Sequence, residues 1–414
     1  NEALRYAITY NPTAPVYGVD APFPFASGQY GGFFETLGLF DSFNPASIAR
    51  QSENDGTTNT INYSMNFNYR LTDHLAANVN FATQNIKNNR SQYYPTTALY
   101  LGNAVSPTTR GLANFLTQET RFDLFEGFAT YNNTIGDNIS FTATAGYSFQ
   151  ETDFNNVFFQ LGDFPPGIEF DFRNNIESSQ DLTEAGRIVA NSDRRDGDRI
   201  VAFFGRLNAT FDDAIYLNAS LRREGSSRFG GENQWGLFPA VAVGADLNKY
   251  LDLDNVNLLK ARLGYGVTGA IPPEVGLFET TYALNPGTSG QDGSSTGQGN
   301  RAPNPDLKWE EKAELNFGIE FATERLSATL DLYTRNIDDF ISLVNVDAAL
   351  FGGISTRYEN AGQLKTNGLE FTVNYDAVKN DSFNYNTGLI FSTYKTTLEK
   401  NPQGDQVIAN LGSP

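Results

Sequence analysis

A strict alternation of apolar and polar side chains in residues 60–83 constrains the fold most strongly. Large apolar residues fill every second position, with only Asn, Ser and Arg between them: Ile61, Tyr63, Met65, Phe67, Tyr69 and Leu71. After a break at residues 72–74 the alternation restarts and runs to Phe81. Because successive side chains of a strand point to opposite faces, this stretch predicts a hairpin with one apolar and one hydrated face.

The same pattern recurs in five further pairs of segments along the chain. These pairs are 124–133 with 139–149, 201–211 with 215–221, 237–247 with 259–267, 313–321 with 326–332, and 369–375 with 383–391. Alternating runs of about 10 to 12 residues approach the length of roughly 9 to 11 that crosses a bilayer at a tilt. The sequence therefore predicts an all-β fold of six hairpins, about twelve antiparallel strands.

The placement of charges favours a membrane barrel over a soluble sandwich. In the fifth pair Glu314, Glu320 and Asp331 all fall on the polar face, and the opposite face carries no charge. A charge facing lipid costs up to roughly 2–4 kcal/mol at the bilayer midplane. A soluble, carbohydrate-binding β protein stays open as an alternative, although sandwich strands average only about 5 to 6 residues. We predict a transmembrane antiparallel β-barrel.

Composition narrows the class of function. The formal charge of −19 repels nucleic acid, and the absence of cysteine excludes disulfides, thiolate metal sites and cysteine nucleophiles. No apolar run approaches the roughly 20 residues of a membrane-spanning helix. The mean hydropathy of −0.39 is nevertheless compatible with barrel strands, which alternate lipid-facing and lumen-facing residues.

The connections between the predicted strands are short on one side and long on the other, as in outer-membrane barrels. The long segments are predicted extracellular loops: 84–120, 150–198, 223–235, 268–308 and 336–357. No secretion signal is visible in the first residues, NEALRYAITYNPTAP. Because twelve strands left open in lipid would expose unpaired backbone groups, we expect residues 1–414 to be one partial barrel domain.

Six motifs follow one another along the chain: NPTAPVY at 11–17, FNPASI at 43–48, FFGRLNATFDDAIYLNASLRREGSSRFGGENQWGLFPAVAVG at 203–244, LLKARLGYGVTG at 258–269, NPDLKWEEKAELNFGIEF at 304–321 and ENAGQLKTNGLEFTVNY at 359–375. Together they resemble the SusC/RagA-like family of TonB-dependent outer-membrane transporters. The resemblance covers nearly the whole chain. It implies a 22-stranded barrel around an N-terminal plug, with the plug, the TonB box and the terminal strands outside this sequence.

The resemblance also implies a function and partners. Such a protein imports oligosaccharides or peptides across the outer membrane of a Gram-negative bacterium, driven through TonB and capped by a SusD-like surface lipoprotein. A passive porin is the alternative transport hypothesis. Neither hypothesis calls for an enzyme or a resident cofactor.

Candidate site residues follow from the alternation. Eight charged residues on the polar face are predicted to line the lumen and to contact substrate or plug: Arg206, Arg222, Lys260, Arg262, Glu314, Glu320, Asp331 and Glu370. Five loop aromatics are predicted to stack on sugars or to bury against the lipoprotein: Tyr93, Tyr94, Tyr100, Phe158 and Phe159. Mutual pairing of the lumen charges is favoured over substrate contact.

Other chemistries have weaker sequence support. GYGVTG at 264–269 has dinucleotide-motif spacing, but Ile-Pro-Pro follows it where a helix is required. The single histidine, His74, is expected in an exposed turn without catalytic partners. Adjacent carboxylates at 310–311 and 338–339 point to opposite faces, which defeats glycosidase geometry. A loop-bound calcium ion is a minority hypothesis that rests on Asp193, Asp196, Asp198 and Asp292.

Overall fold

The computed structural model describes residues 2–18, 30–35, 43–103, 111–164, 175–183, 189–280, 282–285, 295–298 and 301–401. Twelve long strands form one sheet: β1 (Glu53–Arg70), β2 (Leu75–Tyr94), β3 (Leu112–Ile135), β4 (Ile139–Gly162), β5 (Val189–Phe211), β6 (Ile215–Ser226), β7 (Trp235–Asp246), β8 (Leu258–Ala270), β11 (Glu310–Ala322), β12 (Leu326–Asn345), β13 (Thr356–Lys379) and β14 (Asn384–Lys400). The other elements are short: the α-helices α1 (Glu2–Thr9), α2 (Pro45–Gln51) and α3 (Asn248–Leu251), the hairpin of β9 (Tyr282–Asn285) with β10 (Ser295–Gln298), and single helical turns at Leu99–Asn103, Ile176–Ser178, Gln180–Thr183 and Gly231–Gln234.

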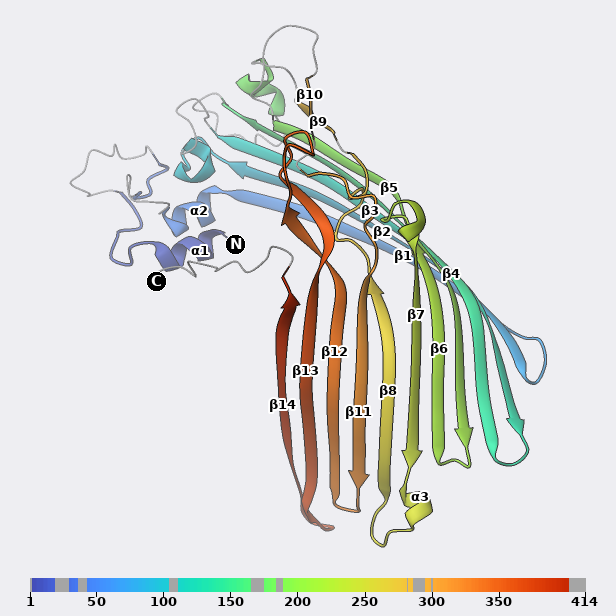
Figure 1. The fold of residues 1–414 in the computed structure, drawn as a ribbon. Helices are drawn as coiled ribbons and strands as arrows, with labels where there is room; N and C mark the ends of the chain where they lie inside the picture. Colours follow the sequence, from blue (N-terminus) through green and yellow to red (C-terminus); the bar gives the residue numbers. More distant parts are fainter. Residues whose placement is uncertain are drawn as a thin grey trace. The chain divides into compact units, whose positions relative to one another are not determined.

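The order of strands in the sheet follows the order in the sequence, with β9 and β10 left out between β8 and β11 (Figure 1). The pairs from β5 to β8, and from β8 through β11 to β14, are antiparallel. These observations confirm the predicted all-β, antiparallel class and the twelve strands. Among the described residues, no helix is long and apolar enough to span a membrane.

Two compact units divide the chain. The first unit comprises Asn1–Tyr63, Thr83–Phe122 and Thr152–Asp196, and the second comprises Ser64–Ala82, Asp123–Glu151 and Gly197–Pro414. Strands β1 to β5 contribute residues to both units, whereas β6 to β14 lie wholly in the second.

Local sequence explains why helix α2 of the first unit begins at Pro45. Asn44 caps α2, because its side-chain oxygen accepts hydrogen bonds from the backbone N–H groups of Ala46 (3.0 Å) and Ser47 (3.4 Å). Pro45 occupies the first helical position, where a missing N–H costs nothing. A small core of Tyr93, Ala113, Leu161 and Phe164 packs near the ends of β2, β3 and β4.

The second unit has two small clusters, Phe229 with Phe238 and Trp309, and Leu277 with Leu307 and Ile341, while the apolar face of its sheet is exposed. Phe203 and Leu263 each keep 52% of their surface accessible, and Phe317 keeps 39%. In a soluble sandwich these side chains would be buried against a second sheet. The exposed face is instead what a barrel wall presents to lipid.

The strands are longer than the sequence predicted, which corrects several loop boundaries. β2 continues to Tyr94, β4 continues to Gly162 and β12 continues to Asn345, so parts of the predicted loops 84–120, 150–198 and 336–357 are strand. The predicted loops 223–235 and 268–308 also contain strand residues, namely the end of β6 in the first and the β9–β10 hairpin in the second. The alternation is lost in these extensions because both faces carry polar residues, as in QETDFNN at 150–156. A strand with water on both sides needs no period-two pattern.

Candidate functional site: the charged face of the sheet

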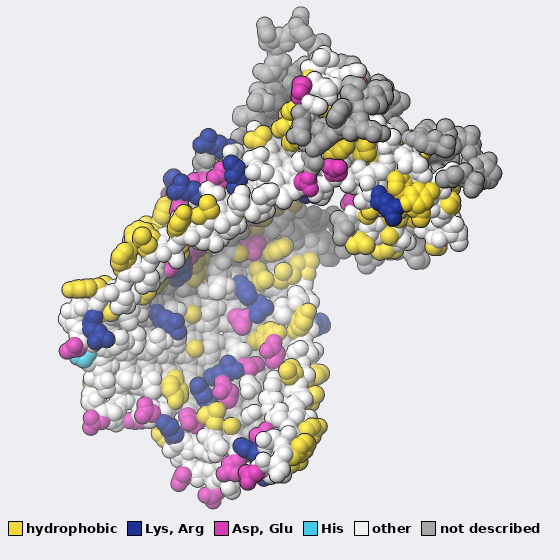
Figure 2. All heavy atoms as spheres, turned by 180° about the vertical axis from the view of Figure 1, so that it is seen from behind, with side chains coloured by type: hydrophobic (Ala, Val, Ile, Leu, Met, Phe, Trp, Pro, Cys, Tyr) yellow, Lys and Arg dark blue, Asp and Glu magenta, His cyan; other side chains and the backbone are white. Residues whose placement is uncertain are grey.

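The strand register brings all eight predicted lumen residues onto one face of the second unit. Directly opposed residues share a face of the sheet, and one register row passes from Arg262 on β8 to Gly318 on β11, Asp331 on β12 and Glu370 on β13. Arg206, Arg222, Lys260, Glu314 and Glu320 have the parity of this same face. Figure 2 shows basic and acidic side chains side by side across the hollowed face of the sheet. We call it the charged face.

Arg262 is the centre of an ion-pair cluster on this face. Its Nη2 donates to both carboxylate oxygens of Asp331, at 2.8 and 2.7 Å, and its Nε lies 3.2 Å from Oε1 of Glu320. The Nε contact lacks hydrogen-bond alignment, so it acts as a charge contact only. Gly318 lies between Arg262 and Asp331 in the middle strand, and its missing side chain leaves room for the pair to meet.

A second pair joins Glu314 to Arg335, a residue that the sequence analysis did not single out. Nε of Arg335 donates to Oε2 of Glu314 at 2.7 Å, and the guanidinium lies 5.6 Å from the Tyr333 ring centroid. The alternation alone places Arg335 on the same face as Asp331, four residues away, which is a signal that could have identified it.

The remaining predicted residues have varied surroundings. Lys260 sits 4.7 Å from the Tyr216 ring centroid, and Arg222 pairs with Glu224. Within the described part of the chain, Arg206 and Glu370 have no ion-pair partner.

A hollow of about 360 Å³ lies on the charged face over β7 and β8. Its floor is flat because Ala240, Ala242, Gly264 and Gly266 have little or no side chain. Polar groups surround this floor: Asn218, Thr268, Lys312, Glu314 and Asn316. The hollow offers close approach to the sheet wall, with charged and amide groups at its rim.

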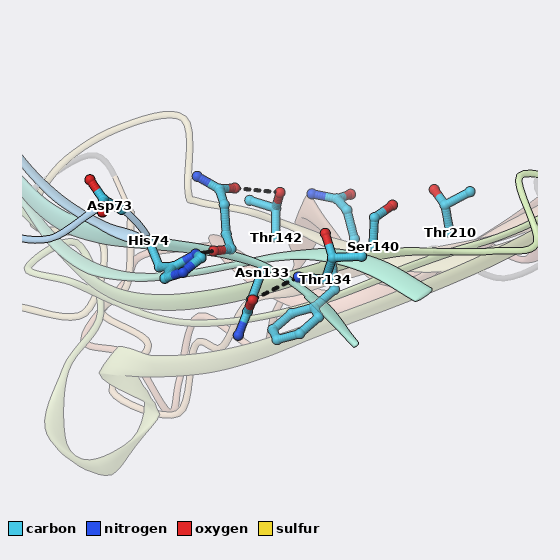
Figure 3. Close-up of a pocket in the computed structure, with 10 residues that line it drawn as sticks. Asp73, His74, Asn133, Thr134, Ser140, Thr142 and Thr210 are labelled. Carbon is cyan, nitrogen blue, oxygen red and sulfur yellow. Dashed lines mark hydrogen bonds between the residues drawn. The ribbon is translucent and has the colours of Figure 1, made fainter. Parts of the chain in front are cut away.

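A second hollow, of about 640 Å³, lies near the turns of the second unit (Figure 3). Amide and hydroxyl side chains line it: Asn132, Asn133, Thr134, Ser140, Thr142, Asn208 and Thr210. Asn132 accepts a hydrogen bond from the Thr142 hydroxyl at 2.6 Å. These neutral groups provide hydrogen bonding, and Asp73 adds one carboxylate to the same lining.

His74 borders this hollow in the exposed turn that the sequence predicted. Its Nδ1 lies 3.0 Å from the carbonyl oxygen of Asn132, so Nδ1 carries the proton and donates it. Figure 3 shows the Asp73 carboxylate directed away from the imidazole. A general base needs an orienting acid, whereas the hydrogen-bond partner of the His74 ring is this backbone carbonyl.

The predicted loop aromatics are mostly not in loops. Tyr93 and Tyr94 end β2 and are buried, and Phe158 and Phe159 lie in β4. Phe159 stacks on Phe115 with ring centroids 4.8 Å apart. Phe158 and Phe159 are half-buried, and all four rings lie in strands because β2 and β4 extend past the predicted boundaries. Contact of these rings with a ligand or a lipoprotein stays a prediction.

Tyr100 is the one predicted aromatic outside a regular strand. Its ring meets those of Phe43, Tyr6 and Tyr94, with centroids 5.2, 5.6 and 5.8 Å away. Burial, together with the nearby negative charge of Glu2, raises the pKa of Tyr100 to about 12. The hydroxyl is therefore protonated at physiological pH.

The acids of the calcium hypothesis are distributed differently from the prediction. Asp193 and Asp198 lie in β5 rather than in a loop, and each pairs with an arginine: Asp193 with Arg195, and Asp198 with Arg228 at 2.6 Å. Asp196 is in the same strand, and Asp292 lies outside the described residues. The GYGVTG stretch is part of β8, as the sequence predicted.

Comparisons with known proteins agree with this architecture. The TonB-dependent receptor P3 of Formosa agariphila is 27% identical over 89% of this chain, and SusC of Bacteroides thetaiotaomicron is 30% identical over 50%. A chain of the RagAB peptide importer superposes with a TM-score of 0.76 at 21% identity, over 88% of this chain. The matched parts are 36% of P3, 21% of SusC and 39% of the RagAB chain, so this chain spans well under half of these relatives.

The family model described as "TonB dependent receptor-like, beta-barrel" matches residues 2–411, almost the full length. These two relatives are named as TonB-dependent receptors. They include SusC by name, which confirms the resemblance drawn from the motifs. The chain belongs to the β-barrel family of TonB-dependent receptors.

Proposed function

We propose that this chain forms part of the barrel wall of a nutrient importer in the outer membrane of a Gram-negative bacterium. The importer takes up oligosaccharides or peptides, is energised through TonB, and works with a SusD-like surface lipoprotein. One observation carries the proposal: on β6 to β13 large apolar side chains are exposed on one face of the sheet, whereas the Arg262–Asp331 and Glu314–Arg335 ion pairs lie on the other.

That arrangement suits a wall between lipid and an aqueous passage. Charges inside a barrel satisfy one another or tune selectivity, whereas a charge on the lipid face is costly. The Arg262 cluster and the Glu314–Arg335 pair have the first role in this proposal. Arg206 and Glu370 are the charges assigned to the plug or to the substrate.

The named relatives support the choice of substrates. RagAB is described as a peptide importer, and SusC as a TonB-dependent receptor. Family membership favours active import over passive diffusion through a porin.

Uptake by the full-length protein in cells tests this proposal. A strain lacking the gene is complemented with the parent gene, and entry of labelled oligosaccharides and labelled peptides is measured with and without TonB. We expect entry of one substrate class that requires both the gene and TonB, and a lipoprotein that co-purifies in detergent. Entry that persists without TonB indicates a porin, and recovery of the protein in the soluble fraction contradicts the membrane assignment.

A further inference from the structure

A polar patch interrupts the outward, apolar face of the sheet on its last three strands. Its residues are Thr334 and Asn336 on β12, Lys365 and Asn367 on β13, and Lys395 and Thr397 on β14. Thr366 and Thr396, whose hydroxyl oxygens are 3.0 Å apart, belong to the charged face. The lysines next to them in sequence therefore point outward.

One register row shows where this patch lies relative to the apolar band. The row runs through Ala219, Val241, Tyr265, Leu315, Thr334, Asn367 and Lys395. It is apolar on β6 to β11 and polar on β12 to β14. Both β6 and β14 run toward the long connections, and in that direction the outward apolar residues end at different places. On β6 the last one, Leu221, lies two residues past the row position Ala219; on β14 the last one, Phe391, lies four residues short of the row position Lys395.

Strand tilt accounts for this shift of the band edge. From β6 to β14 the row crosses six spacings between neighbouring strands, each of about 4.8 Å. When the strands tilt by about 40° from the membrane normal, the two ends of the row differ by roughly 18 Å along that normal. Between β6 and β14 the end of the outward apolar residues shifts by about six residues along the strand, which corresponds to roughly 15 Å along that normal. The two estimates agree, so Lys365 and Lys395 lie at the rim of the hydrocarbon band. The rim is the one nearer the long connections.

The two lysines are close together and have no counter-charge. Lys395 is opposite Asn367 and Lys365 is opposite Thr397, so the lysines are diagonal neighbours about 7–8 Å apart at the backbone. Neither has an ion-pair partner within the described ranges. Asp338, two positions beyond Asn336 on β12, accepts a hydrogen bond from Gln363 at 2.5 Å, and Glu399 lies in an irregular step of the register.

We propose that Lys365 and Lys395 bind the phosphate of a phosphorylated lipid in the outer leaflet, with Asn367 and Thr397 as hydrogen-bond donors. Two flexible ammonium groups can converge on one phosphate, while the lipid chains lie on Leu369, Phe371 and Phe391 just below. A membrane lipid is the fitting occupant because the cationic pair adjoins exposed apolar surface. The inference rests on the membrane location in the proposed function.

Native mass spectrometry of the full-length protein in detergent tests this site. The probes are lipid A with two phosphates, the same lipid A after dephosphorylation, and inorganic phosphate as a competitor. We expect the Lys365→Gln/Lys395→Gln variant to bind the phosphorylated lipid about 20- to 30-fold more weakly, from a factor of about five for each lysine near an anionic surface. Lys365→Arg/Lys395→Arg should retain binding.

The matched control is Lys249→Gln/Lys379→Gln, which removes the same charge at the turn end of the strands and should bind as the parent does. Equal binding of dephosphorylated lipid A, an unchanged Gln variant, or competition by millimolar inorganic phosphate overturns the inference. Substrate uptake and the heat-dependent gel mobility of a folded barrel are followed in parallel. A parent protein that shows neither substrate uptake nor heat-dependent mobility would refute the proposed function. A parent protein that shows both but binds the phosphorylated lipid weakly would refute the lipid site alone.

Discussion

At the scale of single residues, Gly318 shows how a missing side chain organises the charged face. A Cβ atom at this position would lie 2.5 Å from Nε of Arg262 and 2.8 Å from Oδ1 of Asp331. We expect Gly318→Ala to separate the ion pair and to lower the free energy of unfolding by roughly 1–3 kcal/mol. Denaturant unfolding of the full-length protein in lipid vesicles measures this change.

The control for that substitution is Gly264→Ala on the neighbouring strand β8. There the new Cβ meets only the Cβ of Ala242, at an ordinary 3.6 Å. The two variants add the same methyl group to the same face. If Gly318→Ala and Gly264→Ala lowered the free energy of unfolding equally, the role of Gly318 in leaving room for the Arg262–Asp331 pair would be contradicted.

A buried carboxyl group in the first unit predicts a pH dependence. Burial raises the pKa of Glu35 above its ordinary value of 4.5, although the Asn44 N–H donates to Oε2 at 2.8 Å. Because the folded state then binds the proton more tightly than the unfolded state, the free energy of unfolding falls as the pH rises from 4.5 through the raised pKa.

Glu35→Gln should remove this pH dependence while keeping an acceptor for Asn44. The measurement is the free energy of opening from hydrogen exchange of the Ile48 amide, which donates to the Asn44 carbonyl in α2. We expect the parent to lose protection between acidic and neutral pH and the Gln variant to keep it. A parent whose protection is constant over that range would contradict the assignment.

Sequence could place these residues on a face but could not choose their partners. Alternation assigns Arg262 and Asp331 to one face because each strand has period two. The bond between them joins residues 69 positions apart, and it exists only because the register of two strand pairs aligns them across Gly318. The Arg335 partner of Glu314 was missed for the same reason.

At the scale of elements, sequence predicted the strands where the environment differs between their faces. In β6, β7, β8 and β11 the predicted segments and the observed strands nearly coincide, because lipid and lumen impose the alternation there. The distal half of β4 and the start of β5 carry polar residues on both faces, and the sequence analysis read them as loops. Backbone pairing continues there without an amphipathic pattern.

The register of β13 against β14 predicts a specific cross-link. Thr366 and Thr396 are directly opposed on one face, so their Cβ atoms lie within about 4.5–5.5 Å. The variant Thr366→Cys/Thr396→Cys should form a disulfide on mild oxidation, which a mobility shift after proteolysis between the two positions detects. Thr366→Cys/Lys395→Cys, with side chains on opposite faces, is the control. Equal cross-linking of both would contradict the register.

At the scale of the whole molecule, the two faces of the sheet have opposite requirements, and neighbouring residues of one strand test them. Phe317 of β11 is in the apolar row with Leu263 and Leu332, and Asn316 points to the charged face. In lipid, Phe317→Arg places a charge in the hydrocarbon band at a cost of roughly 2–4 kcal/mol, whereas Asn316→Arg adds a charge to an aqueous wall.

Unfolding of the full-length protein from lipid vesicles by urea compares the two variants. We expect Phe317→Arg to lower the free energy of unfolding by most of this cost of roughly 2–4 kcal/mol. Asn316→Arg should lower it by less than about 1 kcal/mol, the usual range for an exposed substitution. The comparison is informative because Phe317 is 39% exposed in the sheet itself. If the face that carries Phe317 met water, arginine would be tolerated at position 317 as well as at position 316. Equal stability of the two variants would therefore contradict the assignment of this face to lipid.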